Sequence, residues 1–471
     1  MWDLQRYGSH TAIIDDKGVQ VTYHDLMAIQ QRVADKIGRR TLVVALCRNS
    51  IGAIAGYVSF LNLRIVPILL NANLDDSLME NLFFLYLPQY IWLPSDMVFR
   101  KTFSNMEIVY SEYDYSLLRT TYDKEYPLYS ELGLLLTTSG STGSPKLVRQ
   151  SYTNILSNAH SIMSYLKLDE TERPITTLPM NYTYGLSIIN SHLLAGATIL
   201  VTDKSLLQKE FWIFFKEQKA TSFGGVPYTY EILDKLRFTK MELPSLRTMT
   251  QAGGKLTLEL HAKFAKYAAE NDKYFVVMYG QCEATARMGY LPSEMAMKKC
   301  GSMGIAIPGG KFSLIDADGL PVKEMNQTGE LVYEGPNVTL GYAECGDDLS
   351  LGDERHGVLC TGDIAQYDED GYYYIVGRKK RFLKIYGNRI NLDEVDRLIK
   401  DAFGGIDCAT TGVDDHLYIF ITEKDLARGI KGFVSEKTKL NPAAFEIVVI
   451  NEIPKSDAGK ILYKELGKYY Q

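Results

Sequence analysis

Apolar residues in the first part of the chain follow two alternating patterns. Residues 22–38 carry apolar side chains at every third or fourth position, which predicts an amphipathic helix, and residues 41–47 form a nearly continuous apolar run, which predicts a buried strand. The same two patterns return as a helix at residues 51–63 and a strand at residues 65–70. This alternation predicts an α/β fold with layered, largely parallel sheets that helices cover on both faces.

Later segments extend this organisation and then change it. Helices are predicted at residues 151–165, 186–194 and 392–403, and strands at residues 90–94, 132–136, 197–202, 221–227, 246–255, 274–284, 312–315, 329–334, 372–376, 408–413, 416–422 and 446–450. From Gly301 onward, short strands separated by Asp-Gly and Gly-Pro turns predict a small β subdomain. Residues 382–471 are expected to form a compact α/β end piece.

Composition and charge exclude several classes of protein. The 471 residues are 46% hydrophobic and 23% charged, as in an ordinary globular protein. The net charge of −6 provides no general attraction for nucleic acid or anionic lipid. The longest apolar region, residues 51–72, is interrupted by Asn62, Arg64 and Pro67, so no membrane span is expected. Scattered cysteines and an N-terminus without an apolar leader predict a cytoplasmic protein with neither disulfides nor a zinc site.

The most distinctive stretch is Thr137-Thr138-Ser139-Gly140-Ser141-Thr142-Gly143-Ser144-Pro145-Lys146, which follows the predicted strand at residues 132–136. Small residues let backbone N–H groups converge on an anion, the hydroxyls add donors, and Lys146 adds positive charge. A Walker loop is disfavoured, because it needs Ser or Thr directly after its lysine and this chain has Leu147 there. A flexible Ser/Gly linker would not need the Pro-Lys ending. The stretch therefore predicts a loop that binds a phosphate chain.

Two further stretches lie at the ends of predicted strands, which is where α/β sheets usually bind ligands. Gly253-Gly254 follows one strand, and taken alone it indicates only a turn. Tyr279-Gly280-Gln281-Cys282-Glu283 follows the next strand and places a carboxylate behind a turn. Farther along, Thr361-Gly362-Asp363 fits either a β-turn or a polar site.

Together these stretches resemble, over almost the whole chain, the AMP-forming adenylating superfamily of acyl-CoA synthetases, adenylation domains and luciferases. The matching motifs are, in order, Thr22-Tyr23, residues 61–67, the phosphate-binding stretch, residues 279–283, Gly329-Glu330-Leu331, residues 342–363, Gly377-Arg378, residues 384–387 and Pro454-Lys455-Ser456-Asp457-Ala458-Gly459-Lys460. Each motif is weak alone, but the full set in the family's order is specific. The resemblance implies a large N-terminal domain at residues 1–378 and a small, mobile α+β C-terminal domain at residues 379–471, which turns about a hinge at Lys380.

The resemblance also implies a set of ligand contacts. ATP would place its β- and γ-phosphates in the phosphate-binding stretch, and Glu283 would bind Mg²⁺, a hard cation that combines one or two carboxylates with phosphate oxygens. Asp363 would accept hydrogen bonds from the ribose hydroxyls, and Arg378 would donate there. The residues implied to contact the nucleotide are Thr138, Ser139, Gly140, Ser141, Thr142, Gly143, Lys146, Gly253, Gly254, Tyr279, Gly280, Gln281, Cys282, Asp363 and Arg378.

Lys460 matches the family's catalytic lysine. A substrate carboxylate attacks the α-phosphate while pyrophosphate leaves, and a cation is needed because both reacting groups are anionic. A lysine on a loop of a mobile domain can enter for this step and leave afterwards. The C-terminal domain would then turn so that residues 384–387 line a tunnel for a thiol, supplied by CoA or by the phosphopantetheine of an acyl carrier protein.

The acid itself is only partly constrained by the sequence. Tyr182, Tyr184, Gly225 and Val226 are expected to line a modest pocket with some polar capacity. No acidic residue lies between Thr176 and Ser187, where amino-acid-activating domains place an aspartate, so a free α-amino acid is disfavoured.

Two departures from the family pattern affect the interpretation. Cys282 stands where threonine is common, and a thiol is a weaker donor than a hydroxyl, although a tolerated packing substitution is the preferred interpretation. The segment 379–471 is short for the family, which places the second half-reaction in more doubt than the first. The leading hypothesis is an ATP-dependent acid–thiol ligase. The alternatives are a luciferase-like adenylating oxidoreductase and a nucleotide-binding protein without turnover, which the intact set of polar motif residues disfavours.

Overall fold

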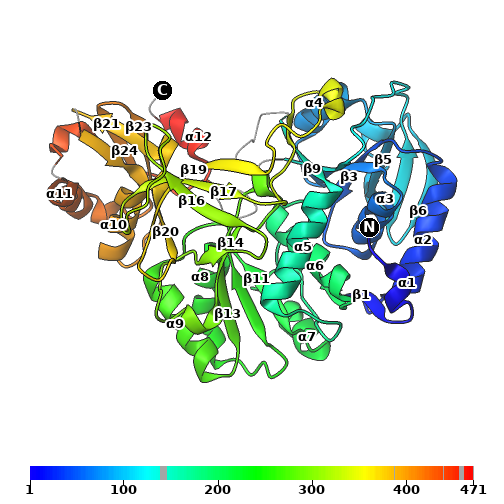
Figure 1. The fold of residues 1–471 in the computed structure, drawn as a ribbon, viewed down its shortest axis with the longest axis horizontal. Coiled ribbons are helices and arrows are strands. Elements are labelled where there is room, and N and C mark those ends of the chain that lie inside the picture. The colour runs from blue at the N-terminus through cyan, green and yellow to red at the C-terminus, as the bar shows by residue number, and fades with distance from the viewer. Residues whose placement is uncertain (138–145, 387, 439, 456–460, 470–471) are drawn as a thin grey trace.

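The computed structural model describes residues 1–137, 146–386, 388–438, 440–455 and 461–469. Strands and helices alternate over the first part of the chain, and the C-terminal elements lie together at one end of the molecule, at the left in Figure 1. The short helix α1 (Leu4–Tyr7) begins the chain and packs against α2 (Tyr23–Lys36). α2 starts at a capping box, because the Thr22 side chain accepts from the Asp25 amide while the Asp25 side chain accepts from the Thr22 amide.

The largest sheet has eight strands in the order β18-β9-β8-β4-β3-β5-β7-β6. These strands are β3 (Leu42–Cys47), β4 (Val66–Asn71), β5 (Tyr90–Pro94), β6 (Glu107–Glu112), β7 (Tyr115–Arg119), β8 (Leu132–Thr137), β9 (Leu147–Ser151) and β18 (Gly341–Ala343). The four central strands are parallel, and the outer pairings are antiparallel. Helices α2 and α3 (Ile51–Asn62) pack on one face and α4 (Asp76–Tyr86) on the other, so every residue of β3 is buried.

A second sheet has five strands in the order β11-β12-β13-β14-β15. Its strands are β11 (Ser222–Gly225), β12 (Thr248–Gln251), β13 (Tyr274–Tyr279), β14 (Gly289–Leu291) and β15 (Ile305–Ala306). The first three are parallel, and their core is shared with α7 (Lys209–Glu217), α8 (Pro227–Lys235) and α9 (Leu258–Glu270). A small third sheet joins β10 (Ile199–Val201), β1 (Thr11–Asp15) and β2 (Gln20–Thr22).

Helices α5 (Tyr152–Leu166) and α6 (Thr183–Ala195) lie side by side between the eight-stranded and five-stranded sheets (Figure 1). α6 is buried on every side, and all but one of its residues are buried although several of them are polar. Such a helix can be stable only in the interior, where it contacts protein on every side. Its N-terminal turn faces the ends of the strands of the second sheet, so α6 forms one wall of the region described below.

The chain then forms smaller units. An antiparallel sheet contains β16 (Lys311–Ile315), β17 (Gly329–Glu334), β19 (Val358–Tyr367) and β20 (Tyr373–Arg378). After it come the hairpin β21 (Phe382–Ile385) and β22 (Asn388–Asn391), the three-stranded sheet β23 (Cys408–Val413), β24 (His416–Ile421) and β25 (Phe445–Val449), and the helices α10 (Leu392–Ala402), α11 (Ala427–Thr438) and α12 (Tyr463–Leu466). The elements after residue 379 have hydrophobic clusters of their own.

The fold class predicted from the sequence is confirmed, since layered α/β sheets, a small β unit and an α+β end piece are all present. The large sheets are parallel only at their centres. The outer strands β6, β7, β9 and β18 of the first sheet, and β14 and β15 of the second, pair with their neighbours in antiparallel orientation. Within the described ranges, no helix is both long and apolar enough to cross a membrane.

Candidate active site

The parallel strands β11, β12 and β13 end at the same edge of their sheet. In the register of the sheet, Gly225 lies opposite Gln251, and Gln251 lies opposite Val277. The residues that follow these positions are Val226, Gly253-Gly254 and Tyr279-Gly280-Gln281, so the structure brings together three stretches that the sequence singled out. This edge of a parallel sheet is where α/β folds usually hold their ligands.

Glycine is required at two of these positions for different reasons. Gly253 has a φ of +84°, and a Cβ atom there would lie 2.7 Å from the Tyr182 hydroxyl oxygen. At Gly280 a Cβ atom would lie 1.7 Å from the carbonyl oxygen of Ala286, so any side chain would collide with the backbone. Gly280 is therefore needed for packing of the turn, whereas Gly254 has only Pro227 within 4 Å of its Cβ position and leaves a more open surface for a flat ring.

Asp363 is the centre of a polar cluster beside this edge. It lies on β19 opposite Arg378 of β20, and its side chain is almost fully buried. The Tyr279 hydroxyl donates to Oδ2 of Asp363 at 2.5 Å, and Nε2 of Gln281 donates to the same oxygen at 2.8 Å. Nε of Arg378 donates to Oδ1 at 3.1 Å. The cluster joins the second sheet to the small β sheet.

The electrostatics of the cluster keep the Tyr279 phenol as a hydrogen-bond donor. Burial and the neighbouring Asp363 both raise the pKa of Tyr279 well above its ordinary value, so the phenol stays protonated and donates. The Arg378 side chain is 63% exposed while that of Asp363 is 4% exposed. The guanidinium therefore covers the carboxylate from the solvent side, where an incoming hydroxyl could share the same oxygens.

Glu283 follows β13 in a short 3-10 turn, and several residues fix its position. The Tyr342 hydroxyl donates to Oε1 of Glu283 at 2.8 Å. The backbone carbonyl of Glu283 accepts from the Thr339 hydroxyl at 2.9 Å and from Nη1 of Arg355 at 3.0 Å. Among the described residues, no group of three or more His, Cys, Asp or Glu side chains could hold a metal. A single fixed carboxylate fits Mg²⁺, which takes its remaining ligands from phosphate and water.

The Tyr342 ring lies between two cations. The Lys146 ammonium is 3.9 Å from its centroid, and Cζ of Arg355 is 4.6 Å from the same point. Lys146 also lies 3.6 Å from Glu344. The lysine predicted to hold phosphate is thus connected through one aromatic ring to the carboxylate predicted to hold the metal.

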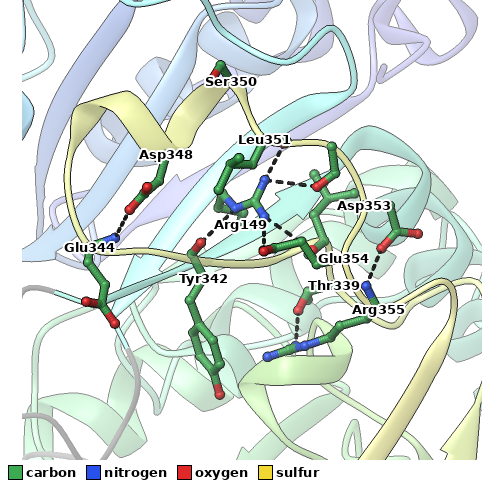
Figure 2. A network of polar contacts seen from close by, with 12 residues as sticks. Arg149, Thr339, Tyr342, Glu344, Asp348, Ser350, Leu351, Asp353, Glu354 and Arg355 are labelled. Atoms are coloured by element: carbon green, nitrogen blue, oxygen red, sulfur yellow. Dashed lines mark hydrogen bonds and ion pairs between the residues drawn. The ribbon is translucent and has the colours of Figure 1, made fainter.

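A buried arginine holds the loop that carries Tyr342 (Figure 2). Arg149 on β9 is fully buried and donates to the carbonyl oxygens of Tyr342, Leu351 and Gly352, and also to Glu354. Figure 2 shows these contacts converging from one side of the loop, with the Tyr342 ring projecting away from Arg149. One side chain therefore fixes both ends of the segment that presents the ring to Glu283.

The predicted acid pocket is a cluster of aromatic and aliphatic side chains. Tyr184 and Val226 are buried in one cluster with Tyr182 packed against it, and the rings of the two tyrosines lie 6.4 Å apart. The Tyr184 hydroxyl lies 2.8 Å from the Thr250 hydroxyl. The Cys282 thiol is buried and lies 3.4 Å from the Thr183 hydroxyl, as expected for a packing role at the start of α6. The cluster joins α6 to the ends of β11 and β13.

Some predicted residues cannot be located. Residues 138–143, predicted to hold phosphate, and Lys460, predicted to be catalytic, lie outside the described residues. Lys455 and Ile461, on either side of Lys460 in the sequence, pair in an antiparallel bridge. The Lys455 ammonium lies 5.4 Å from the ring centroid of Tyr228. Tyr228 is on α8, the helix that begins directly after the expected pocket residue Val226. Lys380 lies in a 3-10 turn between β20 and β21.

Sequence reasoning missed three residues of this region, namely Tyr342, Arg355 and Arg287. Tyr342 lies inside a matching motif but received no role, because the sequence does not show which way an aromatic ring points. Arg287 is a single cation in the otherwise uncharged run Ala284–Leu291. A charge inside an otherwise uncharged run was the signal that could have identified it.

Comparisons with known proteins agree with this geometry. The chain is 29% identical to the oxalate–CoA ligase of Arabidopsis thaliana over 72% of its length and 67% of that protein's. Across the plant CoA ligases that match, the chain spans between 60% and 67% of their lengths. It is also 25% identical to the 2-succinylbenzoate–CoA ligase of Oceanobacillus iheyensis, over 97% of this chain and 96% of that protein.

A solved structure shows the same fold. The o-succinylbenzoate CoA synthetase of Bacillus subtilis, in complex with its acyl-adenylate intermediate, superposes with a TM-score of 0.80 at 21% identity, covering 98% of this chain and 97% of that one. The family described as AMP-binding enzyme matches residues 94–343, which include Lys146, Glu283 and Tyr342. Since this match spans more than half of the sequence, the chain belongs to the AMP-binding enzyme family.

Proposed function

We propose that the chain is an ATP-dependent ligase that adenylates a carboxylic acid and then transfers the acyl group to a thiol, with CoA as the acceptor. Pyrophosphate leaves in the first half-reaction and AMP in the second. The observation that carries this proposal is the buried carboxylate of Asp363, which Tyr279, Gln281 and Arg378 hold at the ligand-binding edge of a parallel sheet. A fixed, charged acceptor of this kind suits the paired hydroxyls of a ribose.

The phosphates of ATP would lie near Glu283 and Lys146. Lys146 and the hydroxyl-rich residues 138–143 would bind the β- and γ-phosphates, and Glu283 would bind Mg²⁺. Mg²⁺, when bound, supplies positive charge that screens the phosphate oxygens. Tyr342 keeps the Glu283 carboxylate oriented, so the metal ligand is fixed before the nucleotide arrives. Gly254, Tyr279 and Gln281 would border the adenine and ribose.

The division into two domains, at residues 1–378 and 379–471 with a hinge at Lys380, is part of the same proposal. The separate hydrophobic clusters after residue 379 support it, as does the position of Lys455 against Tyr228. Lys455 lies in the same motif as Lys460 and close to the acid pocket. Lys460 would therefore reach the reacting carboxylate and α-phosphate when the C-terminal domain is in this orientation.

The acid would enter between Tyr182, Tyr184, Gly225 and Val226. CoA and the phosphopantetheine of a carrier protein present the same thiol, and CoA is the preferred acceptor because the named relatives are CoA ligases. The cytoplasm is the proposed location, since CoA and ATP are both available there.

Acid-dependent exchange of pyrophosphate into ATP tests the first half-reaction. We expect exchange with at least one carboxylic acid and a loss on the order of 100-fold in Lys460→Ala, because a preorganised cation stabilises the transition state. Lys464→Ala, which removes an exposed lysine of α12 from the same segment, is the matched control and should retain exchange.

AMP release with CoA or with a phosphopantetheinylated carrier protein tests the second half-reaction. Discharge by CoA supports the proposal, whereas discharge only by the carrier protein would change the acceptor. Full exchange in Lys460→Ala would remove that lysine from the mechanism. Absence of exchange with every acid would refute the ligase activity.

A further inference from the structure

A buried arginine beside the expected acid pocket has no anionic partner among the residues that the structure describes. Arg287 lies just before β14 and is 2% exposed. Its Nε donates to the Ser187 hydroxyl at 3.0 Å, and its Nη1 donates to the Tyr165 hydroxyl at 3.1 Å. Nη1 also lies 3.1 Å from the Met278 sulfur, a weak acceptor. Every one of these partners is neutral.

Two other arginines with largely buried side chains are paired with carboxylates. Arg149, which is equally buried, contacts Glu354, and Arg381 contacts both Asp393 and Asp396. Among the residues that the structure describes, Arg287 forms no ion pair. A buried charge without a counter-charge is costly, since neutral donors and acceptors replace only part of its hydration.

The guanidinium lies directly behind the residues that are expected to line the acid pocket. Its Cζ atom is 5.2 Å from the ring centroid of Tyr184, which is one of the expected pocket residues. Met278, which also contacts the Arg287 guanidinium, belongs to the same buried cluster as Tyr184 and Val226. From the strand edge inward, a chain of contacts therefore runs from Gly253 to Tyr182, Tyr184 and Arg287.

Two tyrosines around the guanidinium remain neutral. Burial raises the pKa of Tyr165, and burial raises the pKa of Tyr184 to about 12. Neither phenol can therefore supply a negative charge near neutral pH. The positive charge of Arg287 is therefore not balanced by either phenol.

We propose that Arg287 is a specificity residue that binds a second carboxylate of the substrate, so that the acid is a dicarboxylic acid. This inference rests on the proposed function, because it identifies what binds the unreacted end of the acid that the ligase activates. One carboxylate reacts at the nucleotide, and the other receives charge-assisted hydrogen bonds from the guanidinium, whose planar donors match a carboxylate. The apolar walls formed by Tyr184, Val226 and Met278 contact the carbon chain between the two groups.

Adenylation kinetics with paired substrates test the proposal. The wild-type enzyme is given dicarboxylic acids of increasing length together with the monocarboxylic acid of each matching length, and kcat/KM is measured from pyrophosphate release. We expect one dicarboxylic acid to exceed its monocarboxylic partner by a factor on the order of 100, as for removal of one partner of a desolvated charge pair. In Arg287→Met we expect the dicarboxylic acid to lose this advantage and kcat/KM for the monocarboxylic acid to rise.

The controls separate specificity from stability. Arg173→Met removes a half-buried arginine whose side chain donates to Gln218, away from the pocket, and should leave the ratio unchanged. If Arg287→Met does not fold, the wild-type ratio alone decides. Preference for monocarboxylic acids in the wild type would overturn the inference and leave the ligase activity standing. Absence of pyrophosphate release with both series would overturn the inference and the proposed function together. Calorimetry with ATP would then show whether the site still binds the nucleotide.

Discussion

Tyr342 donates its hydroxyl hydrogen to Oε1 of Glu283 across 2.8 Å. The two residues are far apart in sequence, and the contact forms because β18 pairs with β9 at the edge of the eight-stranded sheet. The same ring lies against the Lys146 ammonium, so one side chain touches both residues that are proposed to hold the metal and the phosphates. Burial and the neighbouring Glu283 raise the pKa of Tyr342 to about 12, so the hydroxyl keeps its proton at neutral pH.

The first prediction concerns this hydrogen bond. Tyr342→Phe keeps the ring between Lys146 and Arg355 but removes the donor to Glu283. A hydrogen bond to a charged group contributes about 1.5–3 kcal/mol, and solvent competes at this half-exposed carboxylate, so we expect the Mg²⁺ concentration for half-maximal adenylation to rise about tenfold. Titration of Mg²⁺ at saturating ATP, in the wild type and in the variant, measures this concentration. An unchanged Mg²⁺ requirement would show that Tyr342 only packs there.

The second prediction concerns the ribose site. Asp363→Asn removes the charge that Arg378 covers and turns one acceptor oxygen into a donor facing the donors of Tyr279 and Gln281. We expect the KM for ATP to rise by a factor on the order of 10 to 100, since charge-assisted hydrogen bonds are lost. The KM for the acid should change much less. Asp316→Asn, which alters a turn-forming aspartate between β16 and β17, is the matched control, and a similar rise in that variant would point to a general defect.

Much of this arrangement was predictable from the sequence, and the reasons for the rest are physical. Hydrophobic periodicity located the central strands and α2, α3 and α5, because these elements have a single buried face or are buried throughout. The antiparallel edges of the sheets were not predicted, since strand direction depends on connections that leave no hydrophobic pattern. The resemblance to the family identified Glu283, Asp363 and Gln281 as candidate ligand contacts. The hydrogen bond between Gln281 and Asp363 and the role of Tyr342 could not be predicted, because these contacts depend on the approach of separate sheets.

The third prediction concerns stability. Arg149 is fully buried and connects β9 to the loop that presents Tyr342, mainly through carbonyl oxygens. Arg149→Met leaves those carbonyls without their donor, and breaking a buried polar network of this kind costs about 3–5 kcal/mol. Urea denaturation should show a decrease of that size in the free energy of unfolding. Glu354→Gln changes only the half-exposed partner and should cost less than about 1 kcal/mol. Equal losses in the two variants would mean that the ion pair, rather than the carbonyl contacts, holds the loop.

The fourth prediction concerns pH. His192 of α6 is buried, and its Nδ1 lies 2.8 Å from the Ile188 carbonyl oxygen, which fixes the neutral ring with a proton on Nδ1. Burial lowers the pKa of His192 from 6.5 to about 4. The unfolded chain therefore binds more protons than the folded chain between pH 6.5 and pH 4, and the stabilising contribution, complete above pH 6.5, is lost as the pH falls.

From pH 7 to pH 5 this single group should reduce the free energy of unfolding by about 2 kcal/mol. His192→Asn can keep a donor toward Ile188 but does not titrate, so the difference in unfolding free energy between the two pH values should shrink by that amount. His10→Asn, which replaces an exposed histidine, should leave the difference as it is in the wild type. Denaturant titrations of the three proteins at both pH values measure the effect, and an identical pH dependence in all three would show that the buried ring is already charged at pH 7 or is accessible to solvent.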